Sequence, residues 1–122
     1  MVSLGLEDKV ILVTGGNQGI GAAIVSLLSE LGAKVAYTDI KVTEGKSGAL
    51  GLQVDVTDLA AMEAAATEIE AKLGPVYGIV ANAGITRDNF YNKLTPQDWD
   101  AVINVNLKGV DHTIRPFING MY

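Results

Sequence analysis

The stretch that decides the fold is Lys9–Gly21, with the sequence KVILVTGGNQGIG. Its first part, Lys9–Thr14, is a continuous apolar and β-branched run, which predicts a strand buried on both faces. The glycines that follow permit positive φ angles and close backbone approach. Apolar residues then recur at helical spacing from Ile20 to Leu31, and Gly32 provides a stop.

A buried strand, a glycine-rich turn and a helix N-terminus together suit a pyrophosphate, because the free N–H groups and the helix dipole both favour an anion. The candidate residues of the turn are Gly15, Asn17, Gln18, Gly19, Ile20 and Gly21. The alternative is a tight turn without a ligand. Against it stands an acid 20 residues after Gly19, Asp39, where the dinucleotide fingerprint requires one.

Strands and helices continue to alternate after this unit. Further strands are predicted at Lys34–Asp39, Leu50–Asp55 and Tyr77–Asn82, and Lys41–Gly48 is predicted to be a loop or a very short helix. One helix is predicted from Asp58 to a stop at Gly74-Pro75, with Thr57 as its N-cap. Another is predicted from the Thr95 cap, with Pro96 in its first turn, to the end of the chain.

This alternation predicts a Rossmann-like α/β fold, in which helices cover both faces of a four-stranded parallel sheet. Right-handed crossovers give the strand order 3-2-1-4. We expect residues 1–122 to form a single, partial NAD(P)-binding domain. Ligands of such sheets bind at the carboxyl ends of the strands, near the point where strand order reverses.

Composition excludes several classes of protein. The chain has 122 residues, 14 acidic and 9 basic side chains, a net charge of −5, one His and no Cys. An acidic chain without a basic cluster is a poor nucleic-acid binder. The absence of Cys and the single His leave no thiolate or His-rich metal site, and they suit a cytoplasmic protein. No apolar run approaches the roughly 20 residues of a membrane-spanning helix.

Polar residues at the strand ends are the next candidates. Asp39 is expected to accept hydrogen bonds from the ribose hydroxyls of NAD and to repel the 2′-phosphate of NADP, unless it is only a solvated carboxylate. Asp55 either meets adenine or helps to cap the helix near Thr57. Asn82, Ala83 and Gly84 either let a cofactor approach closely or form a turn in which Asn82 satisfies local amides.

Asn106 lies on the apolar stripe of the last predicted helix. A buried amide there must find hydrogen-bond partners, so a structural tie between helix and sheet is the simplest interpretation.

These residues resemble the short-chain dehydrogenase/reductases. Four motifs in register carry the resemblance over the whole chain: Thr14-Gly-x-x-x-Gly19-x-Gly21, Asp55, Asn82-Ala83-Gly84 and Asn106. The stretches NAGITRDN from Asn82 and DWDAVINVNLKG from Asp98 are most similar to the 3-oxoacyl-ACP reductase and acetoacetyl-CoA reductase branch. That branch implies NAD(P)H-dependent reduction of a 3-oxoacyl thioester.

The resemblance implies roles for individual positions. Gly15, Gly19, Ile20 and Gly21 would hold the pyrophosphate, Asp39 the adenosine ribose, Asp55 and Val56 the adenine, and Asn82, Ala83 and Gly84 the nicotinamide ribose. Asn106 would be the catalytic Asn, whose backbone carbonyl holds a water of the proton relay. Cofactor choice stays open: Asp39 and the lack of a basic residue at Gln18 favour NAD, whereas this branch commonly uses NADPH.

The family's catalytic Ser, Tyr and Lys would lie beyond Tyr122, so we expect this chain to bind nucleotide and to be inactive alone. The string Tyr37-x-x-x-Lys41 is no substitute, because positions i and i+4 share a face on a helix but not on a strand. An acyl-thioester substrate would bind only if the missing half were supplied.

Without a following strand, Tyr77–Asn82 would be an apolar sheet edge, which predicts a homo-oligomer. The alternative function is a non-catalytic structural or self-assembly module on a flavodoxin-like scaffold that no longer binds a cofactor.

Overall fold

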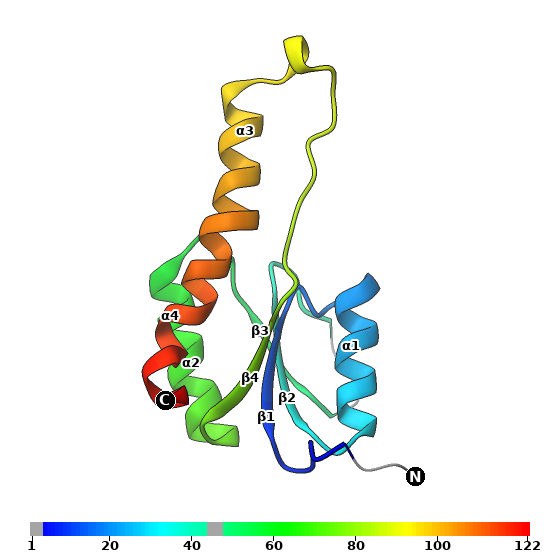
Figure 1. The fold of residues 1–122 in the computed structure, drawn as a ribbon, viewed down its shortest axis with the longest axis vertical. Coiled ribbons are helices and arrows are strands. Elements are labelled where there is room, and N and C mark those ends of the chain that lie inside the picture. The colour runs from blue at the N-terminus through cyan, green and yellow to red at the C-terminus, as the bar shows by residue number, and fades with distance from the viewer. Residues whose placement is uncertain (1–3, 44–47) are drawn as a thin grey trace.

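The computed structural model describes residues 4–43 and 48–122, and its centre is a parallel sheet (Figure 1). The strands are β1 (Val10–Thr14), β2 (Lys34–Asp39), β3 (Leu50–Gln53) and β4 (Val76–Ala81). Their order is β3-β2-β1-β4 and every pairing is parallel, which confirms the predicted order. β3 ends two residues earlier than predicted, and β4 is shifted by one residue. Residues 44–47 of the predicted loop lie outside the described residues.

Helices cover both faces of the sheet (Figure 1). The helical elements are α1 (Gly19–Glu30), α2 (Leu59–Leu73), η1 (Tyr91–Lys93), α3 (Pro96–Ile103), η2 (Asn104–Lys108) and α4 (Gly109–Met121). α1 lies on one face, and α2 and α4 lie on the other, so the three layers are confirmed. α3 and the segment before it extend away from the sheet. In the described part of the chain, no helix combines the length and apolarity needed to cross a membrane.

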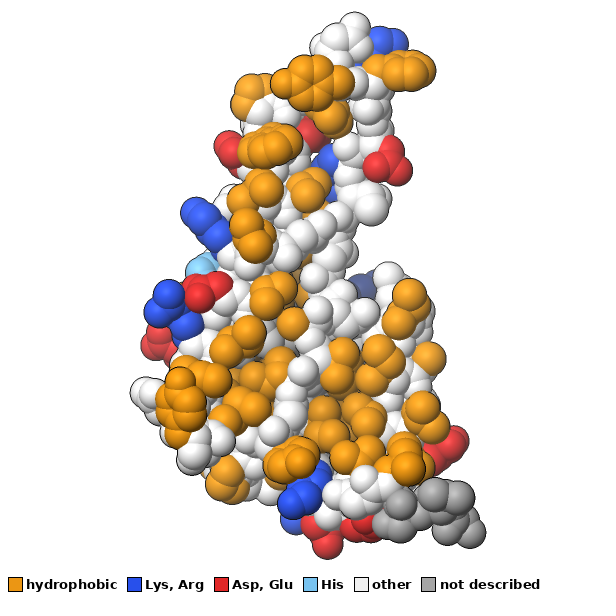
Figure 2. All heavy atoms as spheres, viewed as in Figure 1, with side chains coloured by type: hydrophobic (Ala, Val, Ile, Leu, Met, Phe, Trp, Pro, Cys, Tyr) orange, Lys and Arg blue, Asp and Glu red, His pale blue; other side chains and the backbone are white. Residues whose placement is uncertain are grey.

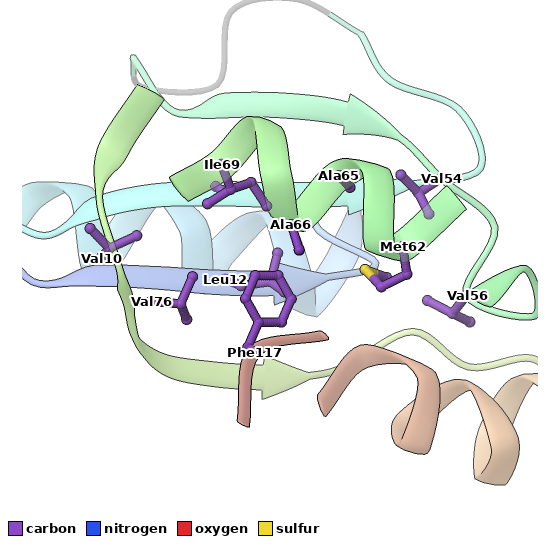
Figure 3. Close-up of a cluster of buried hydrophobic side chains, with 11 residues drawn as sticks. Val10, Leu12, Val54, Val56, Met62, Ala65, Ala66, Ile69, Val76 and Phe117 are labelled. Atoms are coloured by element: carbon purple, nitrogen blue, oxygen red, sulfur yellow. The ribbon is translucent and has the colours of Figure 1, made fainter. Parts of the chain in front are cut away.

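β1 is buried on both faces, as its unbroken apolar run predicts. Val13 packs with Val25 of α1, and Leu12 packs in the larger cluster with Met62 and Phe117 (Figure 3). Leu12 and Val13 are fully buried because alternate side chains of a strand point to opposite layers. Burying one such side chain stabilises the fold by about 1.5–3 kcal/mol. β1 therefore joins the two cores and fixes the carboxyl end where its turn begins.

The predicted start of α3 is confirmed. The Thr95 hydroxyl accepts from the Asp98 N–H at 3.0 Å, and the Asp98 carboxylate accepts from the Thr95 N–H at 3.1 Å. These hydrogen bonds with Thr95 lower the pKa of Asp98 below its ordinary value.

The predicted N-cap of α2 is wrong: Asp58, not Thr57, caps this helix. The Asp58 carboxylate accepts from the Ala61 N–H at 3.1 Å. Thr57 belongs to the turn before the helix, because its N–H and hydroxyl both donate to Asp55 Oδ1, at 2.9 and 2.7 Å. Asp55 thus orders the turn that leads into α2, which is the local role weighed for it above.

The helix that follows Thr95 is not uniformly α-helical. Between α3 and α4, the segment Asn104–Lys108 forms a π-helical turn, η2. Such a turn widens the helix by one residue per turn, and π-turns are frequent at functional sites. Apolar periodicity does not reveal it, because the same stripe continues on both sides of the π-turn, with Asn106 as its member inside it.

Asp58→Ala is expected to lower the free energy of unfolding by about 1 kcal/mol, because the first turn of α2 loses its side-chain cap. Thr57→Val is the matched control, since it removes one hydroxyl bond and leaves the cap. Urea denaturation of both variants measures the difference. A larger loss for Thr57→Val would make Thr57 the residue that holds the start of α2.

Candidate functional site

The glycine-rich turn leaves β1 and enters α1 with two residues in the left-handed region. Gly15 has φ of 68° and Gly19 has φ of 60°. A Cβ on Gly19 would meet no heavy atom within 4 Å, so the turn is open at this point. The Gln18 side chain makes no capping hydrogen bond to α1. The N-terminus of α1 therefore faces open space with backbone N–H groups, as an anion site requires.

A glycine is required at position 21 because a side chain would not fit there. A Cβ there would lie 1.9 Å from the Gly15 carbonyl oxygen and 2.7 Å from Asn82 Nδ2. The first turn of α1 thus packs directly on the backbone of the preceding turn. Gly21 is buried and does not line the cleft described below.

Hydrogen bonds join the end of β1 to the end of β4. The Thr14 hydroxyl accepts from the N–H groups of Asn82 and Ala83, at 3.0 and 3.1 Å. Asn82 Nδ2 donates to the Gly15 carbonyl oxygen at 3.1 Å. Asn82 thus satisfies a local backbone group, as the alternative interpretation expected, and it also fixes the two strand ends against each other.

A cleft of about 680 Å³ opens at these strand ends. Its volume is in the range of small-molecule and cofactor sites. The predicted residues that line it are Gly15, Gln18, Gly19, Asp39, Asp55, Val56, Asn82, Ala83 and Gly84. The cleft therefore brings the ends of all four strands into one site.

Four predicted residues do not line the cleft: Asn17, Ile20, Gly21 and Asn106. The Ile20 side chain is 75% exposed in the first turn of α1. Asn17 is turned toward residue 43, where its Oδ1 accepts from the N–H of Thr43 at 2.9 Å.

Eight further residues line the cleft without having been predicted: Ile40, Val54, Thr57, Ile85, Arg87, Ala101, Asn104 and Val105. Ile40 and Thr57 directly follow predicted site residues, so their place after a strand end was a usable signal. Ala101 and Val105 carried no such signal, because apolar residues of a helix ordinarily pack into the core.

Asp39 lies at one end of the cleft with its carboxylate held on both oxygens. Oδ2 accepts from the Asn17 N–H at 3.1 Å, and Oδ1 accepts from the Ile40 N–H at 2.8 Å. A carboxylate offers about four acceptor positions, so two remain for a ligand. The side chain is half-buried and borders the cleft.

The Asn106 side chain ties the helix to the segment after β4. Its Nδ2 donates to the Ile85 carbonyl oxygen and its Oδ1 accepts from the Ile85 N–H, both at 2.9 Å. The tie differs from the buried helix-to-sheet tie expected from the sequence, because Asn106 is exposed and Ile85 lies four residues beyond the end of β4. The catalytic role that the resemblance implies for the backbone carbonyl of Asn106 stays a prediction.

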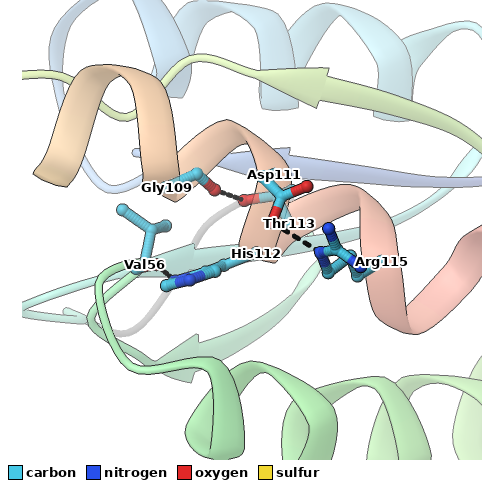
Figure 4. A network of polar contacts seen from close by, with 6 residues as sticks. All are labelled: Val56, Gly109, Asp111, His112, Thr113 and Arg115. Atoms are coloured by element: carbon cyan, nitrogen blue, oxygen red, sulfur yellow. Dashed lines mark hydrogen bonds and ion pairs between the residues drawn. The ribbon is translucent and has the colours of Figure 1, made fainter. Parts of the chain in front are cut away.

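A second tie joins the same helix to the opposite wall of the cleft (Figure 4). His112 Nδ1 donates to the Val56 carbonyl oxygen at 2.9 Å. Gly109 packs beside the same residue, since a Cβ there would lie 2.6 Å from Val56 Cγ2. The continuous helix α3–η2–α4 thus holds both Ile85 and Val56 in place.

Tyr37 is buried away from the cleft, which agrees with its exclusion as a catalytic residue. Its hydroxyl donates to the Thr43 carbonyl oxygen at 3.2 Å. Burial, and then the charge of Asp39, raise the pKa of Tyr37 above its ordinary value. A proton donor acting near neutral pH needs the opposite shift. Within residues 4–43 and 48–122, His and acidic side chains form no cluster of three or more that could hold a metal ion.

Known proteins match this chain over most of its length. A family model described as short chain dehydrogenase matches residues 9–122. Acetoacetyl-CoA reductase of Synechocystis sp. is 70% identical over 122 residues, which are 100% of this chain and 51% of the relative. The 3-oxoacyl-[acyl-carrier-protein] reductase of Vibrio harveyi is 37% identical, over 97% of this chain and 51% of the relative. The chain thus spans about half the length of these curated relatives.

Solved structures of a reductase and a dehydrogenase also match nearly the whole chain. The 3-ketoacyl-(acyl-carrier-protein) reductase of Brucella melitensis, complexed with NADH, is similar at a TM-score of 0.90 and 31% identity. That match covers 95% of this chain and 51% of the reductase. The ligand-free aldohexose dehydrogenase of Thermoplasma acidophilum matches at a TM-score of 0.89 and 31% identity, over 95% of this chain and 45% of the dehydrogenase.

Gly21→Ala is expected to destabilise the protein by about 1–3 kcal/mol, because the added methyl group must displace backbone rather than a flexible side chain. Gly120→Ala in α4 is the matched control: its Cβ would have a nearest neighbour at 4.0 Å, so the usual preference of helices for Ala should stabilise it. Thermal unfolding compares the two. Equal melting temperatures for Gly21→Ala and the wild type would disprove the close packing of α1 on the turn.

Proposed function

The chain belongs to the short-chain dehydrogenase family, and from this premise we propose that it is the N-terminal, nucleotide-binding half of an NAD(P)H-dependent acetoacetyl-CoA reductase. The observation that carries the proposal is the cleft itself. It has the open glycine turn and the N-terminus of α1 on one side, and the held carboxylate of Asp39 at its end. A dinucleotide bound at such a sheet places its pyrophosphate at the helix N-terminus and its adenosine ribose at an acid that follows the second strand.

The residues present fit the cofactor. Gly15 and Gly19 would leave room for the pyrophosphate beside the N–H groups of α1, because Gly19 borders open space. Asp39 would accept from the adenosine ribose, and Asp55 and Val56 would border the adenine. Asn82, Ala83 and Gly84 would border the nicotinamide ribose, and Ile20 and Gly21 would support the pyrophosphate turn from α1. The bound cofactor supplies the hydride.

We propose NAD rather than NADP as the preferred cofactor. Asp39 borders the cleft, and Gln18, which also borders it, brings no positive charge for a 2′-phosphate. A carboxylate at this position accepts from a 2′-hydroxyl and repels a 2′-phosphate. Among the described residues that border the cleft, Arg87 is the only Lys or Arg. It follows β4, whereas the ribose site proposed for Asp39 follows β2.

The substrate and the chemistry are proposed by analogy with the relatives. Acetoacetyl-CoA or another 3-oxoacyl thioester would be reduced by the complete reductase, in which Asn106 contributes to the proton relay. The family's Ser, Tyr and Lys have no counterpart in these 122 residues. The chain alone would therefore hold the cofactor and transfer no hydride, and a cytoplasmic location would suit this role.

One observation favours the second candidate, a self-assembling module without a cofactor. β4 is an edge strand, and Tyr77 on it is 60% exposed. Figure 2 shows hydrophobic side chains gathered over this side of the molecule, around β4 and between α1 and α4. An exposed apolar sheet edge promotes association, so a homo-oligomer is part of the proposal under either function.

Calorimetric titration of the chain with NADH is expected to give a dissociation constant on the order of micromolar to millimolar, the range in which the KM values of enzymes commonly lie. Gly19→Ala should abolish this binding, because a methyl group would enter the anion site. Gly74→Ala is the control: its φ is also positive, at 105°, and its added Cβ also meets nothing, but it lies at the end of α2. Each change costs about 1–3 kcal/mol of backbone strain. Absence of heat from folded wild-type chain would favour the self-assembling module.

The purified chain is expected to show no oxidation of NADH in the presence of acetoacetyl-CoA, since the groups that protonate the substrate oxygen are missing. Absorbance at the NADH band measures the rate. Turnover that scales with protein concentration and survives a second purification would contradict this part of the proposal.

A further inference from the structure

Hydrogen bonds connect Asp39 to residues that do not touch the cleft. Asn17 donates its backbone N–H to Asp39 Oδ2 at 3.1 Å. The side-chain Oδ1 of the same residue accepts twice from Thr43, from its N–H at 2.9 Å and from its hydroxyl at 3.1 Å. Asn17 therefore lies between the carboxylate of β2 and the segment that leaves β2.

Thr43 is held from a second side by Tyr37, whose hydroxyl donates to the Thr43 carbonyl oxygen at 3.2 Å. The Tyr37 ring is itself fixed. A Cβ on Gly16 would lie 2.5 Å from Tyr37 Cβ, and a Cβ on Gly51 would lie 2.6 Å from its hydroxyl oxygen. The backbone therefore closes on Tyr37 from two elements, and Thr43 rests on a rigid support.

The segment between these anchors carries cleft residues. Asp39 and Ile40 both border the cleft, and Ile40 is 68% exposed there. The Ile40 N–H donates to Asp39 Oδ1 at 2.8 Å, so the direction of the carboxylate depends on the path of this backbone. That path is fixed at its far end by Thr43.

We infer that Asn17 and Thr43 are positioning residues for cofactor selectivity: they hold the Asp39 carboxylate in the direction that accepts a ribose 2′-hydroxyl and opposes a 2′-phosphate. The inference rests on the proposed dinucleotide site and deepens it. Neither residue borders the cleft, so neither acts by touching the cofactor. Their effect passes through the two oxygens of Asp39.

Selectivity between the two cofactors depends on the direction in which the Asp39 carboxylate points. Discrimination against a 2′-phosphate requires the negative charge to stay near the 2′ position, because Coulomb repulsion falls with distance and with solvent screening. With the Asn17 side chain removed, Thr43 loses two of the three hydrogen bonds that join it to Asn17 and Tyr37, and the packing of Val42 on the core remains. The carboxylate can then turn toward solvent, which relieves the repulsion of NADPH and weakens the bond to NADH.

The test is the ratio of NADH to NADPH affinity, measured by calorimetry on the 122-residue chain. Asn17→Ala should lower this ratio roughly three- to tenfold, the effect expected for one or two net hydrogen bonds. Thr43→Val should lower it less, since the backbone N–H bond to Asn17 persists. Thr43→Ser keeps both donors and should leave the ratio unchanged. Asp39→Ala is the reference for complete loss of selectivity, and Asn119→Ala, on the exposed face of α4, is the unrelated control.

The possible outcomes distinguish the positioning role of Asn17 and Thr43 from the proposed dinucleotide site. A ratio that falls in Asn17→Ala and Thr43→Val, and is kept in Thr43→Ser, supports the inference. Equal losses of both affinities, with the ratio constant, would mean a merely structural role and would overturn it. A shift in Asp39→Ala alone would also overturn it while leaving the proposed function intact. Failure of the wild-type chain to bind either dinucleotide would instead remove the proposed function. Thr43→Val is nearly isosteric, so it keeps the test valid if Asn17→Ala does not fold.

Discussion

The contact on which the rest of the structure depends is the one between the Gly15 carbonyl and the first turn of α1. Gly21 leaves no space for a side chain there, and Asn82 donates to the same carbonyl from β4. The Thr14 hydroxyl completes the junction with two bonds to the segment after β4. The end of β1 and the first turn of α1, which are neighbours in the chain, thus meet the distant segment after β4 at the carboxyl end of β1. Their approach turns the N-terminus of α1 toward the cleft.

The far wall of the cleft is held by one continuous helix. Asn106 binds Ile85 through two hydrogen bonds, and His112 binds Val56 through one. The π-turn Asn104–Lys108, which contains Asn106, also brings Asn104 and Val105 to the cleft. The segments after β3 and β4 are therefore both tied to a single helix. A ligand between them would contact walls that are fixed from behind, and such preorganisation reduces the entropic cost of binding.

The sequence allowed the sheet order and the glycine turn to be predicted, because both follow from local rules. An apolar run without alternation indicates a central strand, and right-handed crossovers leave one arrangement of four strands. The N-cap of α2 was predicted one residue early, since Asp55 takes both donors of Thr57 in a turn that sequence spacing does not reveal. The π-turn and the position of Asn17 also escaped prediction. Asn106, which lies in the π-turn, and Asn17 both make contacts across the fold, with Ile85 and with Thr43, that sequence spacing does not show.

The most direct test of the account is to map NADH onto the chain by amide chemical shifts of the ¹⁵N-labelled protein. The account predicts shifts at the ends of all four strands: at Gly15 and Gly19, at Asp39, at Val56 and at Gly84. It also predicts that the exposed edge of β4 around Tyr77 remains unchanged. Shifts confined to that edge, or no shifts at saturating NADH from a folded sample, would contradict the claim that this cleft is a dinucleotide site.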